Sequence, residues 1–126
     1  MVLEIAHLTI RPGQNAAFEH AFAQAQQIIA SMPGYLSHEL GHCLERPQDY
    51  VLLVRWVTLE DHEIGFRQSA RYQDWKQLLH HLWRQLPQLV LIDHLEPIEV
   101  QMLLTQLAVV GGHAHAVVGR GAGLDL

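Results

Sequence analysis

The sequence predicts an α+β fold with the element order βαββαβ, in which a four-stranded antiparallel sheet carries both helices on one face. Three observations support this fold. Segments 2–10 and 50–57 are rich in β-branched and aliphatic residues, which is typical of strands. In segments 15–32 and 69–86 the apolar residues recur at intervals of three and four, which indicates helices. Proline and glycine stand at several junctions, so the elements end where the pattern changes.

The N-terminal part predicts one strand and one helix. The run VLEIAHLTI, from Val2 to Ile10, has strand composition, and the Pro-Gly dipeptide after Arg11 ends it. A helix is expected from Asn15, because the apolar residues that follow share one helical face: Phe18, Ala21, Phe22, Ala25, Ile28, Ile29 and Met32. A second Pro-Gly dipeptide, at positions 33 and 34, ends this helix.

Two antiparallel strands and a short helix are expected next. The segment from Tyr35 to Glu45 alternates loosely, and the turn residues after it lead back into the β-prone run from Tyr50 to Val57. Thr58 and Asp61 have the spacing of a capping box. We therefore expect a short helix that begins there and runs toward Phe66.

A longer helix and a last strand complete the predicted order. Ser69 is suited to cap a helix that runs to about Leu86, and Pro87 ends it. The segment from Gln88 to Val100 then predicts the final strand. The result is a ferredoxin-like arrangement whose second sheet face is apolar and needs a partner.

Composition and charge limit the partners of the protein. Its 126 residues fit one domain. The net charge is −5 and the eight Lys and Arg residues are scattered, which argues against nucleic-acid binding. The chain is 49% hydrophobic and 17% charged, a balance that predicts a homo-oligomer with an apolar interface.

The cysteine content, the N-terminal sequence and the lengths of the apolar stretches predict the location and domain organisation of the protein. One cysteine, Cys43, cannot form an internal disulfide, and the N-terminus does not resemble a signal peptide, so we expect a cytoplasmic protein. Apolar stretches are far shorter than the ~20 residues that cross a bilayer, so no membrane span is expected. Residues 1–100 form the predicted domain, and residues 101–126 are expected to be either an arm that packs on a dimer or a poorly ordered tail.

Several short motifs, in their order and spacing, carry a family resemblance. They are LTIRPG, MPGYLSHEL, RW at positions 55 and 56, FRQSARYQDW and HLEPI. Together they resemble the antibiotic biosynthesis monooxygenase (ABM) domains of the dimeric α/β-barrel superfamily over about the first hundred residues. The resemblance implies a homodimer whose two sheets face each other in a barrel, with a pocket between sheet and helices in each subunit. It also implies relatives of three kinds: oxygenases that act on anthrones or quinols without metal or flavin, haem-degrading enzymes, and proteins without an assigned role.

The haem-degrading branch differs from this chain at its characteristic positions. An asparagine, a tryptophan and a histidine are expected there, and this sequence has Ala6, Phe66 and Lys76. These differences argue against haem breakdown by the same mechanism. His80 follows Lys76 by four residues and lies on nearly the same helical face, so contact with a ligand from there remains open.

The long helix carries the candidate base. Its apolar stripe is first of all a core face: Tyr72, Trp75, Leu78, Leu79, Leu82, Trp83 and Leu86. Lys76 and His80 lie at one edge of this stripe, where a pocket mouth would be. Oxygenation without a cofactor needs a flat apolar slot, a base and donors that stabilise the substrate anion. His80 is therefore the predicted catalytic base.

The candidate substrate-binding residues are Phe66, Arg67, Tyr72, Trp75 and Lys76, with His42 and Trp56 on the strands. His42 and His38 share one face of their strand, so they line the pocket if that face looks at the helices and the dimer interface if it does not. Arg55 and Trp56 point to opposite faces, so only one of them can reach the pocket. Arg67 is suited either to an acidic substrate group or to a surface carboxylate.

No metal or other cofactor is expected. Adjacent His80 and His81 diverge by about 100° on a helix, and His113 and His115 could chelate an ion only in an extended segment. We therefore predict a cofactor-independent monooxygenase that acts on an aromatic, quinol- or anthrone-like small molecule with molecular oxygen. The alternatives are a non-catalytic ligand-binding or stress-related module and a haem-binding protein.

Overall fold

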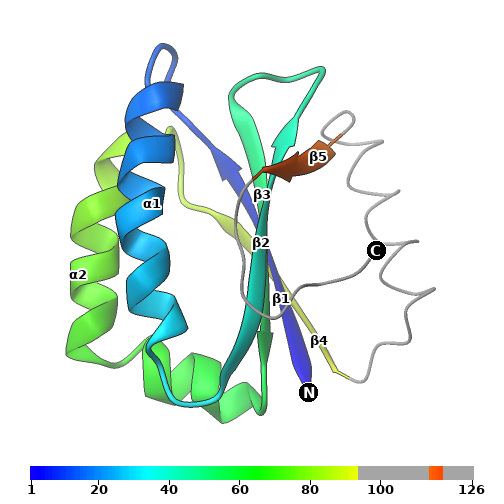
Figure 1. The fold of residues 1–126 in the computed structure, drawn as a ribbon, viewed down its shortest axis with the longest axis vertical. Coiled ribbons are helices and arrows are strands. Elements are labelled where there is room, and N and C mark those ends of the chain that lie inside the picture. Colours follow the sequence, from blue (N-terminus) through cyan, green and yellow to red (C-terminus); the bar gives the residue numbers. More distant parts are fainter. Residues whose placement is uncertain (94–113, 118–126) are drawn as a thin grey trace.

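The structure, a computed structural model, describes residues 1–93 and 114–117 (Figure 1). The predicted strand beyond position 93 and the side chains of His113 and His115 lie outside the described residues. In chain order the elements are β1 (Val2–Thr9), α1 (Asn15–Ala30), β2 (Tyr35–Cys43), β3 (Asp49–Trp56), a π-helix (Asp61–Phe66), α2 (Ala70–Leu79), a 3₁₀ turn (His80–Leu82), β4 (Gln88–Asp93) and β5 (Ala114–Val117).

The described strands form one antiparallel sheet in the order β4-β1-β3-β2-β5. Both long helices, α1 and α2, lie on the same face of this sheet (Figure 1). The predicted ferredoxin-like βαββαβ arrangement is therefore confirmed. The fifth strand pairs with the free edge of β2 and comes from the C-terminal segment, for which the sequence left an arm and a tail open.

The main core lies between the sheet and the two helices. Residues at even positions of β1 and β3 face the helices, because side chains alternate along a strand. They pack against the apolar stripes of α1 and α2, which have the period of three and four that the sequence predicted. The buried members from these strands and helices include Ala6, Leu8, Tyr50, Leu52, Val54, Trp56, Phe18, Phe22, Ala25, Ile29, Trp75 and Leu79.

Helix α2 ends earlier than the sequence predicted. It stops at Leu79, and one 3₁₀ turn follows, whereas the pattern predicted a helix to about Leu86. The chain instead bonds to the end of β1: the Arg11 amide donates to the Leu82 carbonyl at 2.9 Å and the Arg84 amide to the Thr9 carbonyl at 2.7 Å. Because these backbone groups are committed to the strand, they cannot continue the helix.

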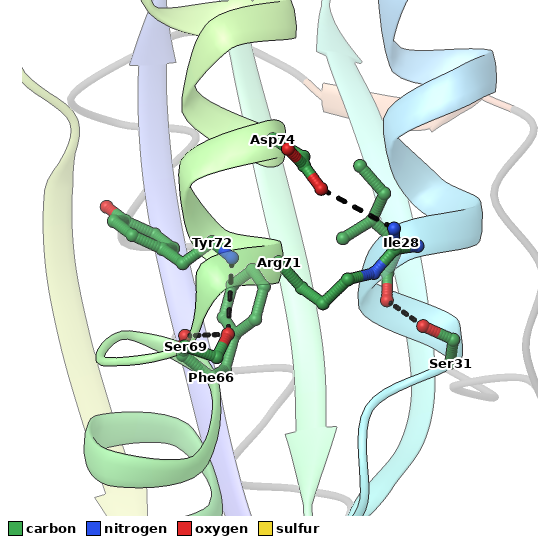
Figure 2. Close-up of polar contacts among 7 residues, drawn as sticks. All are labelled: Ile28, Ser31, Phe66, Ser69, Arg71, Tyr72 and Asp74. Carbon is green, nitrogen blue, oxygen red and sulfur yellow. Dashed lines mark hydrogen bonds and ion pairs between the residues drawn. The ribbon is translucent and has the colours of Figure 1, made fainter.

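The segment between β3 and α2 is held by two capping residues. In the predicted capping box, the Asp61 amide donates to Thr58 Oγ1 and the Thr58 amide to Asp61 Oδ2, both at 3.2 Å. The helix that follows is a π-helix. At its end, Ser69 Oγ donates to the Phe66 carbonyl at 2.7 Å and accepts from the Tyr72 amide at 3.2 Å, as Figure 2 shows. Ser69 is thus the N-cap that the sequence predicted, and it joins the two helices.

Candidate functional site

Six aromatic rings form a closed circuit of contacts between the sheet and the helices. Ring centroids of successive members are 5.7 to 6.4 Å apart, and the last ring returns to the first. We call this set the aromatic circuit; in order, its members are Trp56, Phe66, Trp75, Phe22, His38 and Tyr35. Most of its contacts are edge-to-face or tilted, which is the geometry that aromatic pairs prefer.

Every layer of the fold contributes to the aromatic circuit. Trp56 comes from the central strand β3, and His38 and Tyr35 come from the neighbouring strand β2. Phe22 lies on α1, Phe66 ends the π-helix and Trp75 lies on α2. The sequence predicted Trp56, Phe66 and Trp75 as ligand contacts. It offered no signal that would have linked Phe22 and Tyr35 to them.

His38 is buried and both of its ring nitrogens are engaged. Nδ1 lies 2.5 Å from the Tyr35 hydroxyl and Nε2 lies 3.0 Å from Gln26 Oε1. An amide oxygen only accepts, so Nε2 carries the proton and Nδ1 accepts from Tyr35, given this orientation of the amide. Burial lowers the pKa of His38 and raises the pKa of Tyr35. Both side chains are therefore neutral at pH 7.

A second polar cluster adjoins the aromatic circuit at Trp56. The Trp56 indole Nε1 donates to Glu4 Oε1 at 3.1 Å, and His62 Nε2 lies 3.4 Å from the same oxygen. Glu4 is 7% exposed and His62 is 2% exposed. The His62 ring centroid lies 5.7 Å from that of Trp56. Neither residue was predicted from the sequence, in which a carboxylate inside an aliphatic strand was the one available signal.

The two polar clusters lie in one row across the sheet. Glu4 on β1 and His38 on β2 are both in register with Val54 of β3, one on each side. Two strand spacings separate their backbones by about 10 Å. Val54 is fully buried between them. The helix-facing side of the sheet therefore carries a carboxyl group and an imidazole on opposite sides of the buried Val54.

His42 faces the helices but lies away from the aromatic circuit. Its ring stacks on Tyr50 at 4.3 Å and 7°, and Nε2 donates to the Pro47 carbonyl at 2.6 Å. Tyr50 belongs to the core beneath α1, so the face that His42 and His38 share is the helix face. Of the two alternatives that the sequence left open for these histidines, the structure supports the one that turns them toward the helices.

Arg67, Tyr72 and Lys76 form a rim cluster outside the aromatic circuit. The Tyr72 ring stands perpendicular to Phe66 at 5.1 Å. The Arg67 guanidinium lies 5.0 Å and the Lys76 ammonium 5.9 Å from the centroid of Tyr72. Two cations therefore flank one half-exposed phenol ring, which makes this rim suited to a ligand anion.

His80 lies at the exposed end of α2. Its Nδ1 is 2.6 Å from the Lys76 carbonyl, and its ring meets His81 at 6.0 Å. Its predicted role as the base stays a prediction. In the part of the chain that the structure describes, no group of three His, Cys, Asp or Glu residues could hold a metal ion. No described helix is long and apolar enough to cross a membrane.

The chain is similar to proteins of one family. A family model described as "Antibiotic biosynthesis monooxygenase" matches residues 1–78. The Bacillus subtilis protein YczJ, which is uncharacterized, is 51% identical over 87 residues, or 69% of this chain and 92% of YczJ. A crystal structure of a Bordetella bronchiseptica protein named for the same family has 34% identity and a TM-score of 0.72, and the match covers 75% of this chain and 97% of that one.

A more distant structural match is SnoaB from Streptomyces nogalater, which is described as a cofactor-independent oxygenase. It is 20% identical with a TM-score of 0.67, and the match covers 75% of this chain and 93% of SnoaB. At this identity the similarity concerns the fold alone.

Proposed function

Since the chain belongs to the antibiotic biosynthesis monooxygenase family, we propose that it is a monooxygenase that acts without a cofactor on an aromatic, quinol- or anthrone-like small molecule. The aromatic circuit is the observation that carries this proposal. A flat, fused-ring compound would find ring faces and edges on several sides, together with few but well-placed polar groups.

The proposed reaction uses the substrate as its own reductant. A base removes an acidic hydrogen, and the electron-rich anion then reacts with molecular oxygen. For an anthrone the balance is one ring CH₂ and one O₂ giving one ring carbonyl and one water, so four electrons pass from carbon to oxygen. We assign the stabilisation of the anion to the rim cations Arg67 and Lys76, which lie beside Tyr72, because opposite charge favours formation of the anion.

Three histidines are candidates for the base. His38 belongs to the aromatic circuit and His62 adjoins it at Trp56, whereas His80 is exposed at the end of α2. A general base must lie within hydrogen-bond reach of the hydrogen that it removes. Proximity to the circuit therefore favours His38 and His62, and a His80→Ala variant tests the prediction from the sequence.

Oxygen uptake with a panel of quinols and anthrones tests the proposed activity. We expect uptake above the buffer blank with at least one compound, accompanied by the corresponding carbonyl product. A Phe66→Leu variant removes one ring of the circuit and should lower kcat/KM by up to about tenfold. Phe18→Leu is the matched control, since Phe18 is an equally buried ring that is not a member of the circuit.

The outcomes separate the enzyme from a binding module. No uptake with any compound of the panel would sink the oxygenase proposal. Saturable binding of the same compounds without uptake would support the alternative of a non-catalytic ligand-binding protein. Equal losses in Phe66→Leu and Phe18→Leu would mean that the circuit has no special role.

The assembly and the location are also proposals. We propose a homodimer, as the family resemblance implies. Leu3, Ile5 and Leu53 on the second sheet face are already buried within one chain, so the proposed contact lies at the edge strand β4. Val90 on the adjoining strand β4 is 51% exposed, and a partner would bury it. A cytoplasmic location stays a prediction from the single cysteine, and cell fractionation would test it.

A further inference from the structure

His62 is a buried imidazole with unused hydrogen-bonding capacity. It is 2% exposed, and among the described residues neither ring nitrogen makes a hydrogen bond. The 3.4 Å approach of Nε2 to Glu4 Oε1 is an ion-pair distance that does not meet hydrogen-bond geometry. A buried polar group without a hydrogen-bond partner destabilises the folded state. A buried group without a partner in a native structure needs an explanation, and a ligand that hydrogen-bonds to His62 would be one.

Glu4 determines which nitrogen of His62 is available. Glu4 Oε1 is held in place by the Trp56 indole, which donates to it. A carboxylate next to one imidazole nitrogen favours the proton on that nitrogen, so we expect Nε2 to carry the proton. Nδ1 then has a free lone pair and is a hydrogen-bond acceptor.

His62 lies next to the aromatic circuit. His62 lies in the π-helix, on which the Arg67 amide bonds back to the His62 carbonyl at 2.9 Å. π-helical turns are rare in proteins, and those that occur are often found at functional sites. The His62 ring packs beside Trp56, which is a member of the circuit. His38, in contrast, has both nitrogens engaged, by Tyr35 and Gln26, so it offers a ligand no free acceptor.

We propose that His62, oriented by Glu4, binds the hydroxyl group of an aromatic ligand in the circuit and accepts its proton at Nδ1. Nothing in the family assignment gives either residue this role. His62 is then a catalytic residue and Glu4 is a positioning residue. The proton-transfer step rests on the proposed function, whereas the binding of a phenol does not.

The proposed step is balanced in atoms and charge. The ligand O–H bond breaks, a bond between Nδ1 and hydrogen forms, and the electron pair stays on the ligand oxygen. His62 becomes an imidazolium between two anions, the ligand oxygen and the Glu4 carboxylate.

Nitrogen-15 NMR of the histidine rings in the wild-type protein tests the inference directly. The probes are 2-naphthol, a two-ring phenol, and naphthalene, which has the same rings without the hydroxyl. We expect His62 to have its proton on Nε2 in the free protein, and its Nδ1 signal to move with 2-naphthol but not with naphthalene. His38 is the internal reference, because Gln26 and Tyr35 already occupy its nitrogens.

Two outcomes of the NMR titration would overturn the inference. One is saturation with 2-naphthol that leaves the His62 ring signals unchanged. The other is a proton on Nδ1 in the free protein, since the acceptor would then not exist. This experiment needs no substitution, so a variant that fails to fold cannot obscure the result.

Binding measurements with variants give an independent readout. His62→Phe should weaken 2-naphthol binding by about tenfold and change naphthalene binding much less, because a hydrogen bond is lost and ring volume is kept. Glu4→Gln should keep the fold and reduce the preference of His62 for the Nε2 proton. Equal losses for both probes in His62→Phe would contradict the proposed hydroxyl contact.

The failure of this inference differs from the failure of the proposed function. A His62 response to 2-naphthol without oxygen uptake from any quinol or anthrone would keep the hydroxyl-binding site and reject the oxygenase. Oxygen uptake with His62 signals that no phenol perturbs would keep the oxygenase and reject His62 as its base.

Discussion

His38 shows how burial determines the state of a single residue in this fold. It is 2% exposed, and its neutral form satisfies both Tyr35 and Gln26. If His38 were protonated, Nδ1 would carry a hydrogen and could no longer accept the hydrogen bond from the Tyr35 hydroxyl. Burial accordingly lowers the pKa of His38 below its ordinary value of 6.5.

The pKa of His38 predicts a loss of stability in mild acid. In the unfolded chain His38 takes up a proton as the pH falls below 6.5, while in the folded protein it resists until a lower pH. The unfolded state then binds more protons, so the free energy of unfolding decreases as the pH falls through this window. His38→Gln should show a smaller decrease between about pH 7 and pH 5 than the wild type.

Urea unfolding at several pH values measures this effect. His20→Gln, which removes an exposed imidazole from α1, is the matched control for the loss of one histidine. If His20→Gln and His38→Gln flatten the pH dependence equally, the buried environment of His38 is not its cause.

At the residue scale, the sequence pointed to three rings of the circuit but not to the Glu4–His62 pair, and the role of the predicted site residues stays a prediction. Trp56, Phe66 and Trp75 stood out by size and by their place in the strand and helix patterns, and they are all in the circuit. Glu4 and His62 meet across 58 positions of the chain, through the register of β1 with β3 and the path of the π-helix. The spacing of residues within a short stretch of sequence predicts neither this strand register nor the path of the π-helix.

At the scale of elements, the turn between α1 and β2 is packed against the π-helix. Gly34 has φ +83°, and a Cβ placed there would lie 2.2 Å from Asp61 Cγ. Asp61 is also the acceptor of the Thr58 capping box. The glycine is therefore needed for its left-handed backbone and for the close approach of two elements.

Gly34→Ala should destabilise the protein more than Gly13→Ala. Gly13 has φ +77° with no described atom within 4 Å of an added Cβ, so its substitution costs about 1 kcal/mol of backbone strain. Gly34→Ala adds overpacking against Asp61, which costs about 1–3 kcal/mol more. The free energies of unfolding from urea titrations give the difference. Equal values for the two variants would mean that Asp61 moves away without cost.

Element prediction was most reliable where a local signal defines a boundary. Ser69 and the Thr58–Asp61 pair were recognised as caps, and both act as caps in the structure. The end of α2 was predicted too late, because the apolar stripe continues through Leu82 and Trp83 while the backbone has already turned to pair with β1. That pairing depends on tertiary structure, which periodicity does not reveal.

At the scale of the whole molecule, the fold and family expected from the sequence are confirmed, and the assembly is the next quantity to measure. Both long helices lie on one sheet face (Figure 1), and the exposed Val90 on the edge strand β4 is the apolar residue that the proposed dimer would bury. Light scattering at micromolar concentration should give a mass of about twice the 14.3 kDa of the chain. A monomer mass under these conditions would contradict the proposed barrel.

The central claim is that an aromatic ligand binds at the circuit on the helix-facing side of the sheet. The three tryptophans provide a direct test, since Trp56 and Trp75 belong to the circuit and Trp83 lies beyond the end of α2. Nuclear Overhauser effects between bound 2-naphthol and the assigned indole protons report which of them the ligand touches. We expect contacts to Trp56 and Trp75 and none to Trp83. Contacts to Trp83 alone, or to none of the three at saturation, would contradict the claim.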